Sequence, residues 1–277
     1  MKLFSCGAAI GMAAMAFSVQ AQVHGHLNIG ANSKTHGTPL IWANGVDFMA
    51  SSNYVNTLYF TNANRFAGYY NGNITLTGLA ATSDYGGPDP QAASLGTVIQ
   101  FKMACLEGPA GGNFGFWDAG TTAPSISLSP GQSSTNLWRV SENDGSPGSD
   151  PYGHIHGRRF TATKAGIYKV AFTAVDVSTN GTAKGPIHTP SVPLQVYFEA
   201  GVNIQSVVKT QSQTRVKFAA PANYTWQLMG TDTLQANPVW TPVGAPVVGD
   251  DYFHQVTDAT APIGKRFYRM IGTPIQP

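Results

Sequence analysis

The sequence predicts an all-β protein, an antiparallel β-sandwich followed by a smaller β-sandwich-like module. Apolar and polar residues alternate with a period of two in run after run, which is the pattern of strands that bury one face. Clusters of Gly, Pro, Asn, Asp and Ser separate these runs, as turns between strands require. Charged residues make up only 11% of the 277 residues, under half the ~25% of an ordinary soluble domain. This composition excludes coiled coils and long charged helices.

The first 21 residues predict export. Lys2 precedes an apolar run without charge, and Val19 and Ala21 occupy the −3 and −1 positions of a cleavage site after Ala21. This is the layout of a secretory signal peptide, so residues 1–21 are interpreted as one. No later run reaches the ~18 apolar residues of a membrane-spanning helix. We expect a mature chain without a transmembrane segment, and a secreted, periplasmic or cell-surface location.

Residues 22–200 form the predicted β-sandwich domain. Its alternating runs are dominated by β-branched and aromatic residues, which suit the half-buried surface of a sheet. The clearest expected strands are residues 56–61, 73–79, 97–103, 166–174 and 193–198. Loss of the signal peptide would leave Cys105 as the single cysteine, and one thiol forms no internal disulfide. We interpret Cys105 as a small buried hydrophobe.

Residues 201–277 predict a small C-terminal β module. His and Gly become less frequent beyond Ala200 and Gly201, where the boundary is placed. About six strands in about 75 residues suit an immunoglobulin- or fibronectin-like sandwich. The expected strands are residues 204–209, 214–218, 224–229, 240–243 and 265–271. The run Trp240-Thr-Pro-Val-Gly244 and the closing Arg266-Phe-Tyr-Arg269 resemble the small C-terminal β modules of bacterial secreted proteins.

Two pairs of histidines carry the predicted chemistry. His24 with His26, and His154 with His156, are His-x-His pairs among the seven histidines. Alternate residues of a strand share a face about 7 Å apart, so the imidazoles of a pair can converge on one ion. Two such pairs on facing or neighbouring strands would supply four nitrogens, a tetrahedral set for zinc. His188, in the loop Gly185-Pro-Ile-His-Thr-Pro190, is a further candidate ligand.

Several features of the sequence limit which ion the histidines would bind and whether they would act in catalysis. Neutral imidazole binds zinc, copper, nickel and iron, and zinc is the expected ion, with copper or another transition metal as the alternative. The helical metalloprotease pattern H-E-x-x-H does not occur, and the predicted first mature residue is Gln22, which disfavours a copper site built on an N-terminal histidine. We therefore predict binding without catalysis. The net charge of +2 favours neither nucleic acid nor an anionic membrane as partner.

Two segments resemble a known family. Residues 152–172, with His154-Ile-His156 followed by Gly166-Ile-Tyr-Lys-Val-Ala-Phe172, look like the H-x-H, Phe, Gly-x-Tyr-x-Val-x-Phe signature of bacterial surface-anchored repeat domains. The opening Gly25-His-Leu-Asn-Ile-Gly30 is similar to that family's G-H-x-D-I-G start, with Asn28 where an Asp is usual. These domains accompany metal-uptake ABC transporters, and related exported proteins are under zinc-responsive repression.

The resemblance spans residues 22–200. It implies a β-sandwich that captures zinc or another transition metal, with a metal-uptake transporter or a cell-surface component as partner. His26, His154 and His156 match the family's motifs, and His24 is added here from its spacing. Two alternatives stay open. The chain could be an extracellular carbohydrate- or protein-binding module with incidental histidines, or a hydrolase or oxidase that uses the same histidines with an open coordination position.

Overall fold

The computed structural model describes residues 25–81, 87–140, 153–154, 159–201, 204–260 and 264–275, so the predicted signal peptide lies outside it. The protein is all-β, as predicted, and strands account for half of it. The helical pieces in these ranges are short 3-10 turns at Gly45–Asp47, Ala50–Ser52, Asn64–Phe66 and Thr182–Lys184. Within the same ranges, no helix has both the length and the apolar character needed to cross a membrane.

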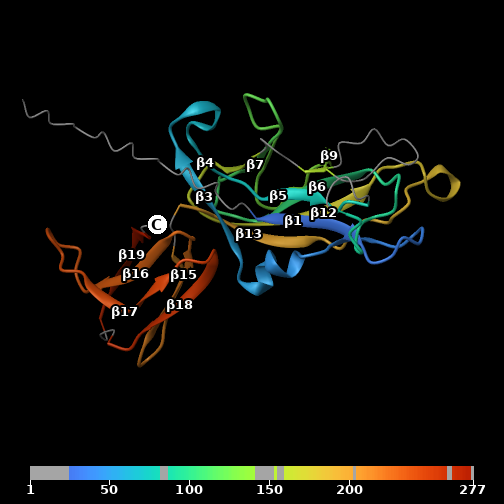
Figure 1. Ribbon diagram of the computed structural model, residues 1–277. Coiled ribbons are helices and arrows are strands. Elements are labelled where there is room, and N and C mark those ends of the chain that lie inside the picture. The colour runs from blue at the N-terminus through green and yellow to red at the C-terminus, as the bar shows by residue number, and fades with distance from the viewer. Residues whose placement is uncertain are drawn as a thin grey trace, which may run out of the picture.

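The larger body contains two sheets (Figure 1). The smaller sheet has the order β10-β5-β1-β2, formed by β10 (Gly153–His154), β5 (Thr75–Gly78), β1 (His26–Ala31) and β2 (Leu40–Trp42). The larger sheet has nine strands in the order β8-β7-β11-β4-β3-β13-β12-β6-β9. These strands are β3 (Val55–Thr61), β4 (Tyr69–Gly72), β6 (Ile99–Glu107), β7 (Phe114–Trp117), β8 (Ile126–Leu128), β9 (Trp138–Arg139), β11 (Arg159–Ala162), β12 (Gly166–Asp176) and β13 (Leu194–Ala200).

An aromatic core fills the larger body. Apolar residues of the smaller sheet, such as Leu27 and Ile29, share one buried cluster with the phenylalanines of the nine-stranded sheet. The ring of Phe116 on β7 lies 5.4 Å from that of Trp138 on β9. Because β7 and β9 lie near opposite edges of the nine-stranded sheet, this contact shows that the sheet curls around the core.

Two strand pairs depart from the antiparallel expectation. β1 runs parallel to β5, and β3 runs parallel to β13. Parallel neighbours need a long connection, and the chain supplies one by passing through β2, β3 and β4 between β1 and β5. The first strand is thereby placed beside a segment more than forty residues further on, in register His26 with Thr75 and Asn28 with Thr77.

Glycine at position 30 is required by a close backbone contact. The amide of Ala31 donates a hydrogen bond of 2.7 Å to the carbonyl of Gln91, so residue 91 crosses the outer side of β1. A Cβ at Gly30 would overlap that carbonyl oxygen. The absence of a side chain at Gly30 therefore lets the loop before β6 pack on the smaller sheet.

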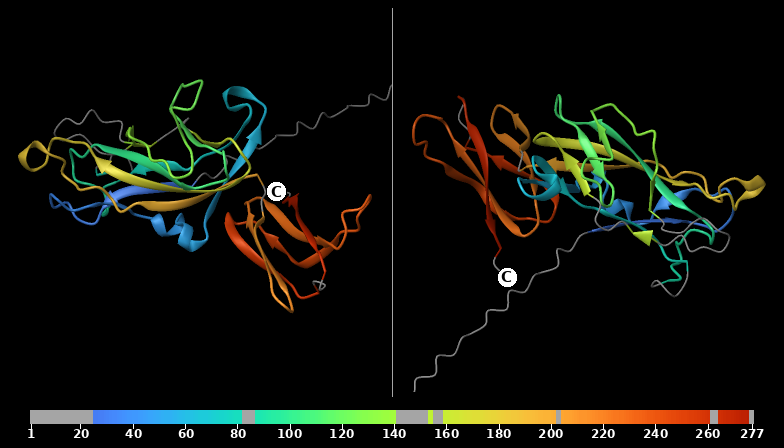
Figure 2. Two further views of the ribbon diagram at one scale, coloured as in Figure 1. Left: turned by 180° about the vertical axis from the view of Figure 1, so that it is seen from behind. Right: turned by 90° about the horizontal axis from the view of Figure 1, so that it is seen from above.

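The C-terminal strands form two three-stranded sheets with a separate core. One sheet has β14 (Ile204–Lys209), β15 (Thr214–Ala220) and β18 (Tyr252–Asp258), and the other has β17 (Thr241–Val248), β16 (Tyr224–Thr231) and β19 (Phe267–Pro274). Val216, Phe218, Trp226 and Leu228 are buried between them. Figures 1 and 2 show these orange-to-red strands gathered at one end of the larger body.

A small apolar cluster joins the two bodies. Val55 on β3 packs with Ala219 and Phe253 of the C-terminal sheets. Two backbone hydrogen bonds of 2.9 Å flank it, from the Val55 amide to the Asp251 carbonyl and from the Phe253 amide to the Asn53 carbonyl. The larger body and the C-terminal strands are thus held by both apolar packing and backbone pairing.

Candidate functional site

The two segments that carry the His-x-His pairs meet in the smaller sheet. β5 lies between β1, which begins at His26, and β10, which ends at His154. Thr77 on β5 is the register partner of both Asn28 on β1 and His154 on β10. The beginning and the middle of the chain are therefore neighbours across a single strand.

One face of this sheet is buried in the core and the other faces outward. Leu27, Ile29 and Leu76 point into the core, so the alternate positions, starting with His26, lie on the outer face. His26 itself is exposed. Residues directly opposite each other in a sheet share a face, which places the register position of His154 on the outer face with Thr77.

The separation of these two backbone positions follows from the geometry of the sheet. Strands lie about 4.8 Å apart and each residue rises about 3.4 Å. His26 and His154 are two strands apart and offset by two residues, which separates their backbone positions by roughly 12 Å.

Hydrogen bonds hold His26 from both sides. Its Nδ1 lies 3.0 Å from the hydroxyl oxygen of Thr77, a side chain that is only 8% exposed. On the other edge of β1, the side-chain amide of Asn44 donates to the His26 carbonyl at 2.8 Å and accepts from the Asn28 amide at 2.8 Å. Sequence reasoning missed both Asn44 and Thr77, since neither stands in a motif.

Two of the predicted ligands lie outside the described residues. They are His24 and His156, and for His154 the structure describes its place in β10 only. Among the described residues, no group of three or more His, Cys, Asp or Glu side chains comes together in a way that could hold a metal ion. What the structure shows of the predicted site is therefore that β1 and β10 each pair with β5, one on either side.

His188 is placed apart from these strands and serves the fold. Its side chain is 1% exposed. Nδ1 lies 3.1 Å from the Thr38 carbonyl oxygen, and Nε2 accepts a 3.2 Å hydrogen bond from the Ser94 amide. The neighbouring residue Thr189 bonds to Leu40, the register partner of Ala31. His188 therefore sits at the end of β1 opposite to His26, with both ring nitrogens engaged, and it is not brought to the predicted ligand set.

We expect His188 to make the fold sensitive to acid. Burial lowers the pKa of His188 below its usual value, and this outweighs the Thr38 carbonyl and the charge of Asp176, which raise it; His36 nearby lowers it further. A histidine whose pKa is lowered in the folded state stabilises the fold at pH values above its unfolded pKa of about 6.5. This stabilisation is lost as the pH falls through the folded pKa. Thermal unfolding at pH 7.5 and 5.5 should show a lower melting temperature at pH 5.5.

The variant His188→Gln should melt at a lower temperature at both pH values but show a smaller difference between them. His36→Gln, at an exposed loop position, is the matched control and should keep most of the difference, because His36 is the weakest of the influences on the pKa of His188. If His188→Gln retains the difference of the wild type, His188 is not the origin of the acid sensitivity.

Cys105 and the aromatic run of β7 both belong to the core. Cys105 is a free, buried cysteine, as predicted, and burial raises the pKa of its thiol to about 11. The thiolate that binds metals is therefore disfavoured at neutral pH. Phe114, Phe116 and Trp117 on β7 are buried as well, so this aromatic run presents no surface for a sugar.

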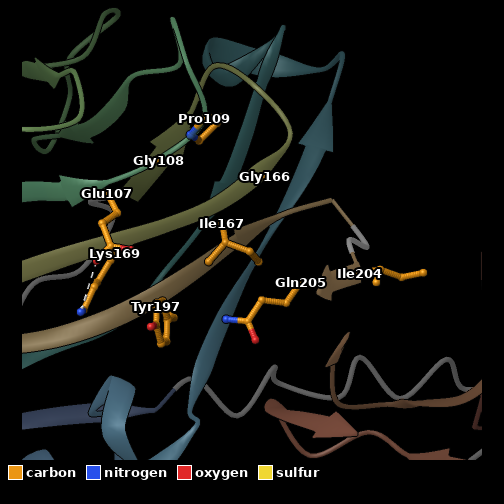
Figure 3. Close-up of a pocket in the computed structure, with 9 residues that line it drawn as sticks. All are labelled: Glu107, Gly108, Pro109, Gly166, Ile167, Lys169, Tyr197, Ile204 and Gln205. Atoms are coloured by element: carbon orange, nitrogen blue, oxygen red, sulfur yellow. Dashed lines mark hydrogen bonds and ion pairs between the residues drawn. The ribbon is translucent and has the colours of Figure 1, made fainter. Parts of the chain in front are cut away.

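A cavity of about 460 Å³ lies where β14 approaches the ends of β6 and β12 (Figure 3). Its charged lining groups are Glu107 and Lys169, whose Oε1 and Nζ atoms are 3.5 Å apart. Nζ of Lys169 also lies 5.9 Å from the ring centre of Tyr197. The two charges offset each other, and the lining indicates no particular ligand.

Comparison of the chain with protein-family models, curated proteins and solved structures finds no match. The resemblance of residues 22–200 to the surface-anchored family therefore stays a prediction. Function has to be argued from the site, because a fold alone does not specify one.

Proposed function

We propose that the chain is an exported protein that binds a transition-metal ion, zinc foremost, on the outer face of the smaller sheet. His26 and His154 are the central ligands, and His24 and His156 complete the set by their spacing in the sequence. The observation that carries the proposal is the placement of β5 between β1 and β10, with Thr77 in register with His154 and bonded to the ring of His26.

The chemistry of the donors favours zinc or a similar ion. Imidazole nitrogens are neutral ligands that suit zinc and copper, whereas calcium and magnesium prefer oxygen. Four such nitrogens would close a tetrahedral shell, which is typical of sites that hold an ion without catalysing a reaction. Copper or another transition metal is the alternative ion.

Capture or delivery of the ion is the role that follows. A chain with a signal peptide would meet the metal outside the cytoplasm, where a metal-uptake transporter or a cell-surface component is the proposed partner. The predicted signal peptide at residues 1–21 and the family resemblance support this location and partner. His188 is left out of the proposed ligand set because its two ring nitrogens hold the loops around Thr38 and Ser94.

Zinc titration of the full chain tests the proposal. The protein is purified without chelator, its metal content is measured by elemental analysis, and zinc affinity is measured by competition with a chromophoric chelator. We expect one zinc ion per chain. The variants His26→Ala and His154→Ala should each weaken binding by at least about 100-fold, because losing a ligand costs more than the 10–100-fold effect of losing an outer partner.

His36→Ala is the matched control, since His36 is an exposed histidine of the same body, and it should bind zinc like the wild type. A wild-type chain that binds no zinc, copper or nickel would contradict the proposal. Equal affinity in the wild type and in both ligand variants would contradict the assigned residues. The extracellular carbohydrate- or protein-binding module would then be the better hypothesis.

A further inference from the structure

The last strand, β19, leaves one long edge of its sheet unpaired. β19 is an outer strand of the sheet β17-β16-β19, whose three labels stand together in Figure 1. It pairs with β16 over all eight of its residues without a shift of register. In the part of the chain that the structure describes, no strand pairs with its other side. A regular, unpaired edge of this kind is a template for pairing with another chain.

The hydrogen bonds of β19 show which backbone groups lie on that free edge. The Ile275 amide donates a 3.0 Å hydrogen bond to the carbonyl of Asn223, just before β16. In an antiparallel strand the N–H and C=O of one residue point to the same side, and that side alternates along the strand. The backbone groups of Tyr268, Met270 and Gly272 therefore point away from β16, towards the free edge.

The opposite edge of the same sheet is protected. β17 contains Pro242 and Pro246, and Gly244 between them has a φ of +65°. The pairing of β17 with β16 also shifts register. Prolines and bulges are the devices that keep an edge strand from pairing with another chain. β19 has a proline only at its last residue, Pro274, so one edge of this sheet is protected and the other is not.

We propose that the β19 edge binds a second copy of this chain, by antiparallel pairing of the two β19 strands around a two-fold axis at Met270. In this register Met270 pairs with Met270 of the second copy, and Tyr268 pairs with Gly272 of the second copy. Each of the three pairs exchanges two backbone hydrogen bonds, which uses every outward N–H and C=O of these residues. Pro274, which has no N–H to donate, lies just outside the paired stretch. The two sheets become one continuous sheet.

The side chains on the outer face of β19 fit this register. Arg269 lies on that face, with its guanidinium 4.3 Å from the ring centre of Trp240. Across the two-fold axis it lies opposite Ile271 of the second copy, a side chain that is 40% exposed. No like charges meet in this pair, and the apolar stem of an arginine can cover an aliphatic side chain.

The two neighbouring registers are worse. A two-fold axis at Arg269 would set the two Arg269 guanidinium groups directly opposite each other, and like charges in that position are destabilising. An axis at Ile271 would set Pro274 opposite Tyr268, and the Tyr268 carbonyl would find no N–H there. The edge of β19 is therefore self-complementary around Met270, which is what a symmetric dimer requires.

Sedimentation velocity of the full chain tests the proposal. A chelator is present, so that no metal ion can bridge two copies. The contact involves one strand of each copy and belongs to the small, transient interfaces, so we expect a reversible dimer to appear between about 10 µM and about 1 mM. Met270→Pro removes a donor from the free edge only and should weaken association at least about 10-fold, because two central hydrogen bonds are lost. Met270→Leu keeps the N–H and should associate like the wild type.

Charge variants of Ile271 give a second test that does not alter the backbone. Ile271→Lys sets a lysine opposite Arg269 of the second copy and should weaken association about 2–30-fold over the two symmetric pairs. Ile271→Glu sets a carboxylate there and should strengthen association by a similar factor. Val248→Lys, on the protected strand β17 and 64% exposed, is the matched control and should associate like the wild type. Near-ultraviolet circular dichroism and the melting temperature check that each variant is folded.

Four results would contradict the proposal. A wild type that stays monomeric up to about 1 mM overturns it, since even weak specific interfaces form at that concentration. A dimer that none of the Met270 and Ile271 variants changes uses another surface. Weakening by Val248→Lys as well as by Ile271→Lys would mean that net charge, and not the β19 edge, controls association. Weakening by both Ile271→Lys and Ile271→Glu overturns the axis at Met270, because Ile271 would then face itself.

Discussion

Replacement of Asp176 by Ala should destabilise the larger body by about 3–5 kcal/mol. This carboxylate is buried at the end of β12 and collects donors from two loops. Oδ1 accepts from the amides of Val98 and Ser178, and Oδ2 accepts from the amides of Ile187 and His188 and from the Ser178 hydroxyl. Without the carboxylate, several buried donors lose their acceptor, and each costs about 1–3 kcal/mol.

The variant Asp176→Asn separates the loss of the acceptor from the loss of volume. Asn has nearly the same shape, but its NH₂ group would face amide donors, so most of the destabilisation should remain. Calorimetry should show a melting temperature about 10 °C lower for Asp176→Ala. Asp47→Asn, an exposed position, should melt like the wild type. A shift under 2 °C in both Asp176 variants would mean that the loops do not depend on this carboxylate.

Part of this arrangement was readable in the sequence. Asp176-Val-Ser178 has the spacing of a turn in which an Asp side chain accepts from the amide two residues on, and the structure contains that bond at 2.8 Å. The bonds from Ile187 and His188 could not be predicted in this way, because they come from a loop whose path is set by packing. The same holds for His188, which reads as a loop ligand in sequence and is a buried structural residue here.

The start residues of three strands agree with the prediction. β14 and β15 begin at the predicted residues, 204 and 214, and β12 begins at 166. β7 was missed because all four of its residues are buried, so no alternation marks it. β4 was missed because all four of its residues are half-buried.

The direction of each strand and the identity of its neighbours could not be predicted from the sequence. Alternation is the same in parallel and antiparallel strands, so nothing at residues 26–31 indicated a parallel partner at 75–78. The sequence did indicate that the two His-x-His segments could be neighbours. Thr77, which lies between them in the sheet, carried no signal, because a threonine in a strand is ordinary.

Replacement of Phe160 by Ala should cost about 3–5 kcal/mol, the usual range for a buried phenylalanine. Phe160 on β11 is 2% exposed, and its ring centre lies 5.5 Å from those of both Phe172 and Phe198 and 5.6 Å from that of Phe116. It therefore joins β7, β12 and β13 through one side chain. Truncation would leave a cavity at the centre of the aromatic cluster, which the surrounding rigid sheet can close only in part.

The same variant connects the core to the proposed metal site. β11 begins at Arg159, five residues after His154 at the end of β10, so the packing of Phe160 anchors the chain next to the histidine segment. We expect Phe160→Ala to weaken zinc binding as well as to lower the melting temperature. Phe160→Leu, which retains most of the volume, should cost under about 1.5 kcal/mol and bind zinc nearly normally.

Phe60→Ala is the matched control on the same sheet. Phe60 is 52% exposed, and its edge-on contact with Tyr70, at 5.1 Å between ring centres, is worth about 1 kcal/mol. Phe60→Ala should leave the zinc affinity unchanged and should shift the melting temperature by no more than a few degrees. If Phe160→Ala melts much earlier yet binds zinc as tightly as the wild type at 10 °C, the histidine segment is positioned without the core. In that case its place beside β5 would depend on the β10–β5 backbone pairing.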